Sequence, residues 1–433
     1  ANNTAVGSGS LEANTTGTGC TAVGTDTLTA NTTSNNNTAI GYLALQDNTS
    51  GSEGTAVGKS CLAENTTGES NTAMGHLALG NNTTGSNNVG LGRAALNSNT
   101  SANENCVVGY YAASSNTTGN SNTAMGTQAF DANTTGQQNC AFGHSALGAN
   151  TTANDNTAIG TSALFSNTTG TRNTAVGHQA MYHNTTAADN VAMGQEAMFN
   201  NKTGGSNVAI GRYALRTLGT SDVFGQLNVA IGQSASYSQN NDSMNVAVGA
   251  NALQACTTGN LNVAMGRLAN NSLTTGSQNV TIGYAAAQTA TTATNCVTLG
   301  YNSAPSSGTA SHEVTLGNSS TNNLRCNDTS ISSLSDRRDK TDIINLTAGL
   351  DFLNTLLPRQ FKWQTRDGNG KDGKIRAGFI AQELQEAQKD FDFLDLVMDN
   401  NPDRLEAKQE HLIPVLVKAI QELSAKVTAL EAG

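Results

Sequence analysis

The chain has 433 residues and a formal net charge of −10, with only 12% charged and 4% aromatic residues. The acidic balance and the lack of basic clusters argue against nucleic acid as a partner. No apolar run approaches the roughly 18 residues that a membrane-spanning helix needs, so we expect no insertion into a membrane.

One unit, N-T-A-I-G-x-x-A-L-x-x-N-T-T-G-x-x, repeats over the first three quarters of the chain. Its fixed glycine recurs at every seventeenth position from Gly7 to Gly211 and again from Gly232 to Gly317, with one longer step between, which makes 19 copies. A fixed period is typical of stacked repeats. Seventeen residues suit one turn of a parallel β-solenoid, so the sequence predicts a mostly β rod over residues 1–317. At a strand spacing of about 4.8 Å the rod is roughly 90 Å long.

The residues before each glycine predict a short strand. The position directly before the glycine is always apolar, and the position before that is small, usually Ala. The third position back is Thr in most early copies and Val from Val191 onward, and the fourth is Asn almost throughout. Period-2 alternation places Thr or Val with the apolar residue on one face, and Asn with Ala on the other. Ala44 and Leu45 after the corner predict a second short strand, and N-T-T-G closes the rung with turn residues.

The asparagine of N-T-T recurs on every rung from Asn14 to Asn201. Stacked in register, these side chains are expected to form an amide ladder along one edge. Many of the triplets are also glycosylation sequons. A sequon on every rung follows from the repeat itself, so we favour the structural interpretation.

The longer step, from Gly211 to Gly232, predicts a protruding loop near residues 216–226. Its apolar Leu218, Val223 and Phe224 are candidates for contact with a neighbouring chain or a receptor. The alternative is a packed elbow loop.

The sequence predicts no metal site and no cofactor. The six His residues are scattered without metal-ligand spacing, and none of the seven Cys forms a CxxC motif. Cys106 and Cys140 share a column two rungs apart, roughly 9.6 Å, which is too far for a disulfide. We predict free thiols that replace Thr as small core residues, which fits a reducing assembly compartment. Few carboxylates lie in the repeats, which disfavours a paired-carboxylate glycosidase site.

The core N-T-A-I-G-x-x-A resembles the head repeats of trimeric autotransporter adhesins. That resemblance implies left-handed parallel β-rolls assembled as a homotrimer. Only the short core matches, and the period here is longer than in the usual adhesin head.

Composition changes after Gly317. Residues 318–334 are polar and predict a neck, and residues 335–433 predict a separate small α+β domain. Residues 361–364 and 374–377 predict a hairpin and residues 380–389 a helix. Asn401 and Pro402 are a plausible start for the last helix, in which Pro414 is expected to cause a kink or a break.

The last helix carries apolar residues spaced 4, 4, 3, 4 and 3 apart, which predicts a coiled-coil seam. The alternative is an ordinary helix that faces its own core. The seam residues are Leu412, Leu416, Ile420, Leu423, Val427 and Leu430.

Four ordered motifs of this domain resemble the intramolecular chaperone domain of peptidase S74 type, found at the ends of phage tail fibres, tail spikes and endosialidases. The motifs are S-D-x-x-x-K at 335–340, L-x-P with F-x-W at 356–363, G-F-I-A-Q-E at 378–383, and L-I-P at 412–414 followed by A-I-Q-E-L at 419–423.

The resemblance implies that the chain cuts itself before Ser335, at the bond to Leu334, once a trimer has formed. Ser335 is then the nucleophile and Lys340 the base that accepts its proton. A lysine serves as a base only if burial or positive charge lowers its pKa, and Arg337 and Arg338 are candidates for that charge. Five residues on a helix turn through about 140°, so a turn or the assembled trimer has to bring the pair together.

These observations predict a structural receptor-binding or adhesion fibre of a phage particle, whose only enzymatic activity is self-cleavage. Expected partners are two further copies, other virion tail proteins and a host surface receptor, with a glycan as one candidate. The expected location is the virion, after assembly in the host cytoplasm. The alternatives are an enzymatic tail spike that degrades host surface polysaccharide and a cellular trimeric adhesin. A tail spike needs a groove of clustered carboxylates and aromatics, which the repeats lack, and an adhesin needs a signal peptide and a membrane anchor, neither of which the sequence predicts. Because the chain begins inside a repeat, we expect an attachment region or a removed leader outside it.

Overall fold

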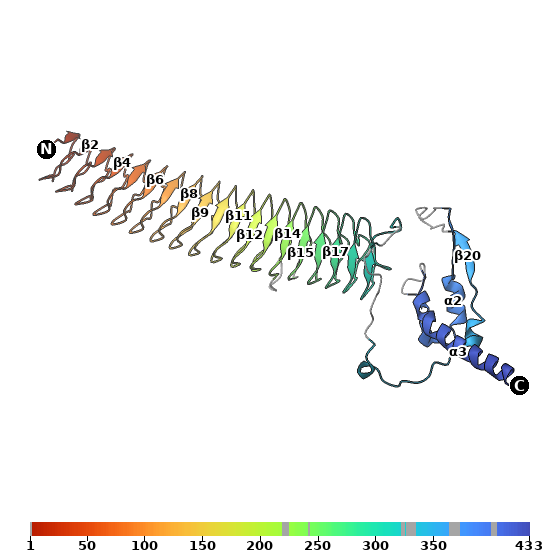
Figure 1. The fold of residues 1–433 in the computed structure, drawn as a ribbon. Coiled ribbons are helices and arrows are strands. Elements are labelled where there is room, and N and C mark those ends of the chain that lie inside the picture. Colours follow the sequence, from red (N-terminus) through yellow and green to blue (C-terminus); the bar gives the residue numbers. More distant parts are fainter. Residues whose placement is uncertain are drawn as a thin grey trace.

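The computed structural model describes residues 2–218, 225–240, 243–321, 325, 335–362, 373–399 and 405–433. A rod of 19 parallel three-residue strands occupies the first part of the chain (Figure 1). Each strand pairs in register with the equivalent strand of the next repeat, as Thr4 pairs with Thr21. The longer step of the repeat falls between Val208 and Val229, which still pair in the same register. The predicted parallel β-solenoid with one rung per repeat is therefore confirmed.

The strands of the rod are β1 (Thr4–Val6), β2 (Thr21–Val23), β3 (Thr38–Ile40), β4 (Thr55–Val57), β5 (Thr72–Met74), β6 (Val89–Leu91), β7 (Cys106–Val108), β8 (Thr123–Met125), β9 (Cys140–Phe142), β10 (Thr157–Ile159), β11 (Thr174–Val176), β12 (Val191–Met193), β13 (Val208–Ile210), β14 (Val229–Ile231), β15 (Val246–Val248), β16 (Val263–Met265), β17 (Val280–Ile282), β18 (Val297–Leu299) and β19 (Val314–Leu316).

The fixed glycine after each strand turns the chain sharply. Gly41 has a φ of 131°, a conformation that side chains rarely adopt. A Cβ atom built on Gly41 would lie 2.6 Å from the carbonyl oxygen of Gly58 in the next rung. Both the backbone angle and the rung stacking therefore require glycine at this position.

The second limb of each rung is a series of turns, so the predicted second strand is wrong. Leu43 and Leu45 have φ values of 59° and 50°, in the left-handed region that a β-strand excludes. The limb still stacks on the next rung, because the Leu45 N–H donates to the Cys61 carbonyl at 3.0 Å. Alternating left-handed residues thus turn the chain while keeping the hydrogen bonds between rungs.

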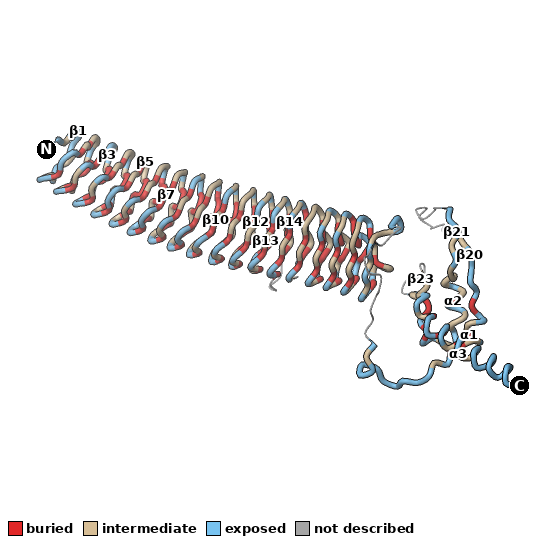
Figure 2. The backbone as a smooth tube through the Cα atoms, viewed as in Figure 1, coloured by how far each residue is buried: buried red, intermediate tan, exposed pale blue. Residues whose placement is uncertain are grey.

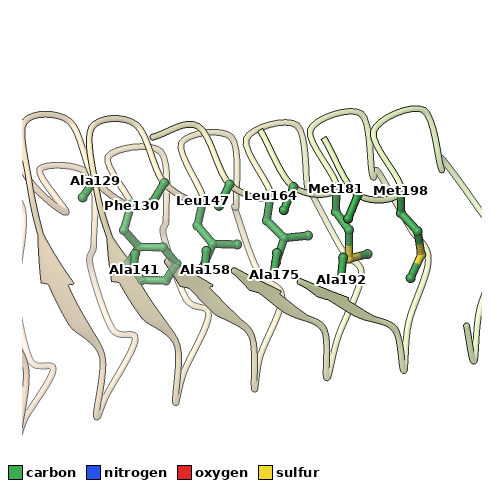
Figure 3. Packing of buried hydrophobic residues seen from close by; sticks show 14 of the residues in the cluster. Ala129, Phe130, Ala141, Leu147, Ala158, Leu164, Ala175, Met181, Ala192 and Met198 are labelled. Carbon is green, nitrogen blue, oxygen red and sulfur yellow. The ribbon is translucent and has the colours of Figure 1, made fainter. Parts of the chain in front are cut away.

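A thin core fills the space between strand and limb. Figure 3 shows Leu164 and Met181 of the limbs directed at Ala175 and Ala192 of the strands. These side chains are fully buried, as are their equivalents in most rungs. Buried residues accordingly run along the inside of the rod (Figure 2). Alanine at the strand position leaves room for the larger limb residue, which explains why that column stays small.

The alternation predicted for the strands is present, and its strictly apolar column points outward. Ile40 is 41% exposed and Met74 51%, whereas Ala39 and Ala73, which lie between the apolar residue and the Thr column, are buried. We call the residues directly before the fixed glycines the apolar stripe. Its exposed members are Val6, Ile40, Met74, Met125, Ile159, Met193, Ile210, Ile231, Met265, Ile282 and Leu316.

The Thr column lies on the same outward face, which corrects one prediction about cysteine. Cys106 is exposed and Cys140 half-buried, so neither is a core residue. Thr123 separates them in the register.

The N-T-T asparagines form the predicted amide ladder, although it lies inside the rod rather than along an edge. Each Nδ2 donates to the Oδ1 of the rung before, at 2.7–3.2 Å, from Asn14 to Asn184. The ladder asparagines after Asn14 are fully buried. Asn201 keeps the column but donates to the Gly204 carbonyl instead. Burial of these amides also supports the structural interpretation of the sequons.

A second asparagine ladder, which we did not predict, runs through the column four before each glycine. The Oδ1 of Asn207 accepts the backbone N–H of Asn228 at 2.9 Å, so this ladder crosses the insertion where the first one stops. It continues to Asn279, which accepts the N–H of Cys296 at 3.0 Å. Glu313 ends the column and accepts the Ser306 N–H at 2.8 Å.

The insertion lies largely outside the described residues, which omit 219–224 and with them Val223, Phe224 and the predicted protrusion. Leu218 is fully buried and occupies the column of the N-T-T asparagines. The prediction that Leu218 contacts a neighbour or a receptor is therefore wrong.

The C-terminal part is a small α+β unit, and it contains the predicted hairpin and middle helix. The hairpin pairs Arg359 with Gly378 and Lys362 with Ile375. Trp363 lies outside the described residues. The elements are η1 (Arg337–Asp339), α1 (Leu350–Leu353), β20 (Arg359–Lys362), β21 (Ile375–Gly378), α2 (Ala381–Ala387), η2 (Asp392–Leu394), β22 (Val397–Met398), β23 (Glu406–Ala407), η3 (Gln409–His411) and α3 (Leu412–Glu431).

The last helix starts later than predicted. α3 begins at Leu412, preceded by β23 and η3, whereas Asn401 and Pro402 lie outside the described residues. Pro414 lies in the first turn of α3, where a helix does not need its N–H, so it does not interrupt the helix. Phe352, Leu384 and Val415 are among the residues that form the core of this unit.

Candidate functional site

Ser335 and Lys340 lie at the two ends of η1, and this turn brings their side chains together. The Nζ of Lys340 donates to the Oγ of Ser335 at 2.6 Å. The turn is capped by Asp336, whose Oδ1 accepts the backbone N–H of Arg338 at 2.8 Å. Leu334, on the other side of the predicted scissile bond, lies outside the described residues.

Asp336 and Arg338 form an ion pair that the sequence reasoning missed. A guanidinium nitrogen of Arg338 lies 2.6 Å from Oδ2 of Asp336. The Arg338 side chain, together with its backbone N–H, lowers the pKa of the Asp336 carboxyl, and the carboxylate raises the pKa of Arg338. The charge of Arg338 is therefore paired with Asp336. Of the two arginines predicted to act on Lys340, only Arg337 has no ion pair among the described residues.

A hydroxyl within hydrogen-bond distance of an amine can lose its proton to that amine once the amine is neutral. Burial favours the neutral amine, since it removes water from around the charged form. Ser335, Arg337 and Lys340 are all exposed in the single chain. The single chain thus provides the contact between the two groups but not the burial that favours a neutral amine.

Two further carboxylates, those of Glu422 and Glu383, make contacts that stabilise the C-terminal α+β unit. Glu422 of α3 accepts the backbone N–H of Leu350 at 2.8 Å, at the start of α1. Glu383 of α2 forms a bidentate pair with Arg359 of β20, at 2.7 Å for the shortest contact. The Leu350 N–H lowers the pKa of Glu422, and Arg359 lowers that of Glu383. Glu383 is the last residue of G-F-I-A-Q-E, so the motif contributes a structural contact.

The predicted seam of α3 divides into a buried start and an exposed remainder. Leu412 packs in the core, together with Val415 and Ala419 on the same helix. From Leu416 onward the seam is exposed, reaching 81% at Leu430. Within the described residues the domain therefore covers only the beginning of this seam.

The described ranges contain neither a metal-binding cluster nor a membrane-spanning helix. No three or more His, Cys, Asp or Glu side chains gather there as metal ligands do. None of the helices described is both long and apolar enough to cross a membrane.

Comparison with known families identifies the C-terminal unit. Residues 335–393 match the peptidase S74 family, described as chaperone of endosialidase. The match starts at Ser335 and ends at Phe393, before β22, β23 and α3. No curated protein and no solved structure matches the chain. The chain thus carries a chaperone-of-endosialidase domain after a β-solenoid, which fits a tail fibre or tail spike with a C-terminal chaperone.

Proposed function

We propose that this chain is a structural, receptor-binding fibre of a phage particle that assembles as a homotrimer. Residues 335–433 bring three copies into register, and the pair Ser335 and Lys340 then cuts the bond between Leu334 and Ser335. The 2.6 Å contact between Lys340 Nζ and Ser335 Oγ, at the first residue of the matched domain, carries the proposal.

Two exposed apolar surfaces support assembly into a trimer. The apolar stripe runs the length of the rod, and the α3 seam is uncovered from Leu416 onward. Contiguous apolar surface of this extent is rare on isolated chains and marks contact with a partner. A parallel trimer buries both surfaces with identical copies, since the stripes line up along one axis and the seams form a coiled coil.

The chaperone role follows from the uniformity of the rod. Each rung contacts only its neighbours, and most rungs repeat the same core and stripe residue types, so a slip of one rung between chains leaves the apolar contacts largely unchanged. Register therefore has to be fixed elsewhere before the rods stack. A compact C-terminal domain with its own core supplies that fixed point. Its later removal makes assembly effectively irreversible, because the rods lose the unit that aligned them.

Exposure of the dyad in the single chain explains why cleavage waits for assembly. Neighbouring copies bury Ser335 and Lys340, and burial favours the neutral amine that can accept the serine proton. The Ser335 oxygen then attacks the carbonyl carbon of Leu334. The Leu334 acyl group moves from the Ser335 nitrogen to its Oγ as an ester, while Lys340 returns the proton to that nitrogen, which becomes the free amine of Ser335. Water then hydrolyses the ester and frees the Leu334 carboxyl group.

The test is the mass of the denatured product. Wild type is expected to yield fragments 1–334 and 335–433, whereas Ser335→Ala and Lys340→Ala yield only the full chain, still trimeric in ultracentrifugation. Thr341→Ala, an exposed neighbour of the dyad, is the matched control and is expected to be cut like wild type. A full-length band in wild type, or cut product from Ser335→Ala, contradicts the proposed cleavage.

A further inference from the structure

The exposed face of the rod has two edges with different chemistry. The corner column, the residue directly after each fixed glycine, contains cationic and aromatic side chains but no acid. Its cationic, histidine and tyrosine members are Tyr42, Lys59, His76, Arg93, Tyr110, His144, His178, Arg212, Arg267, Tyr284 and Tyr301. The leading column, five residues before each glycine, contains Glu53, Glu104, Asp155, Arg172 and Asp189. The apolar stripe runs between these two columns.

Both columns are available on the surface. All five charged members of the leading column are exposed, as are Arg93, His144 and His178 of the corner column. Cations of the corner column lie over tyrosines of the same column: the Arg93 guanidinium is 5.7 Å from the Tyr110 ring centre. Among the described residues, no ion pair joins the corner column to the leading column within one chain, although Arg172 and Asp189 of the leading column pair with each other at 2.6 Å.

A rotationally symmetric trimer brings opposite edges together. Interfaces in a closed ring are heterologous, so one edge of a chain meets the other edge of the next chain. With the apolar stripes turned toward the axis, each corner column faces the neighbour's leading column. We propose that these two columns form a ladder of ion pairs and hydrogen bonds between copies of this chain, an inference that rests on the trimer of the proposed function.

The distribution of charges selects one register. Arg93 faces Glu104 when each corner residue meets the leading residue of the following rung, 11 positions on. The same offset places His144 opposite Asp155, and a neutral imidazole N–H can donate to that carboxylate.

The same offset leaves other cations of the corner column without a charged partner, since Lys59 faces Ser70 and Arg212 faces Leu227 of the next rung. It places His178 opposite Asp189 and the one leading-column cation, Arg172, opposite the uncharged Thr161. Pairing within the same rung instead sets His178 against Arg172 and leaves Arg93 opposite Asn87. The rods are therefore not interchangeable along their length, and the ladder holds the register that the C-terminal domain first sets.

Charge reversal tests the pairing. Arg93→Glu and Glu104→Arg each place three like-charge contacts in the trimer, and the double variant restores opposite charges. Like charges across an interface are strongly unfavourable, so each single variant should dissociate in denaturant about tenfold faster or more, and the double variant at close to the wild-type rate. Arg267→Glu is the matched control: its partner at the same offset is Gln278, so we expect little change.

A zero-length cross-link identifies the partner directly. Arg93→Lys supplies an amine, and carbodiimide coupling should join residue 93 to Glu104 in covalent dimers and trimers, with the linked peptides found by mass spectrometry. Arg267→Lys, opposite Gln278, should give no such link at that offset. If the wild type is trimeric but the double variant does not regain its dissociation rate, the ladder alone is overturned. The same holds if the cross-link forms only within single chains. A monomeric wild type overturns both the ladder and the proposed function.

Discussion

The buried amide ladder makes a graded prediction about single asparagines. Asn99 lies inside the ladder: it donates to Asn82 at 2.7 Å and accepts from Asn116 at 3.2 Å. Asn184 is the last donor: it donates to Asn167 at 2.7 Å, and its own Oδ1 has no partner. Asn99→Ala therefore removes two bonds of the ladder, and Asn184→Ala removes one. Each also removes a bond to the carbonyl of its own turn, Ala102 or Ala187, but those carbonyls keep a second donor, Asn88 or Asn173.

An unsatisfied buried polar group costs about 1–3 kcal/mol, so Asn99→Ala should destabilise its rung by roughly 2–5 kcal/mol and Asn184→Ala by about half as much. Native-state hydrogen exchange with peptide resolution measures this locally, because opening of a solenoid involves mainly neighbouring rungs. The difference should appear as roughly tenfold faster exchange around Asn99 for each 1.4 kcal/mol. Equal or larger acceleration in Asn184→Ala would refute the ladder as a source of stability.

Three further predictions follow from single positions. Gly143→Ala, at a φ of 138° with the next rung's glycine oxygen 2.5 Å from the added Cβ, should lose at least about 1–3 kcal/mol, measured by circular dichroism during thermal unfolding. Burial raises the pKa of the Cys61 thiol to about 11, so iodoacetamide should leave it unlabelled in the native rod, and Cys106 should react in a monomer but not in the trimer. Arg338 lowers the pKa of Asp336, so capping of η1 should persist at neutral pH and be lost as the pH falls through that lowered pKa, which nuclear magnetic resonance titration of the carboxyl can follow; loss on raising the pH would contradict it.

The rod could be predicted from the sequence because its signal is periodic. A glycine at every seventeenth position set the rung length, and the apolar, small and polar columns before it set the strand. The second limb could not be predicted in the same way. Ala44 and Leu45 form a short apolar pair between turn residues, which suggests a strand, but stacking of the rung holds Leu43 and Leu45 in the left-handed region. Propensity does not reveal this, because tertiary context overrides it.

Which face of the strand is buried also could not be predicted from alternation alone. An apolar column beside a polar Asn column suggests the opposite burial from the one observed. Asn207 and its equivalents lie inside because their amides are fully hydrogen-bonded along the stack, which removes most of the cost of burying them. The apolar residues are left outside, where a single chain does not cover them.

At the candidate site, the motif located Ser335 and Lys340 but not the contact between them. Simple helical geometry places residues five apart on different sides, whereas the short η1 turn, capped by Asp336, brings the two side chains to 2.6 Å. The pair of Asp336 with Arg338 depends on that turn, so the sequence offered no signal for it. Ser335 and Lys340 are exposed in the single chain, and the motif carries no information about that exposure.

The central claim is that three copies assemble through the apolar stripe and the α3 seam. Sedimentation equilibrium tests it most directly. The chain to use is purified Ser335→Ala, because it stays uncut under the proposed mechanism. The account predicts a particle of three times the 44.4 kDa chain mass. It also predicts loss of that particle when stripe residues Ile159, Met193 and Ile210 are all changed to Asp. A wild-type rod that sediments as a single chain, or a trimer that survives the triple substitution, would contradict the account.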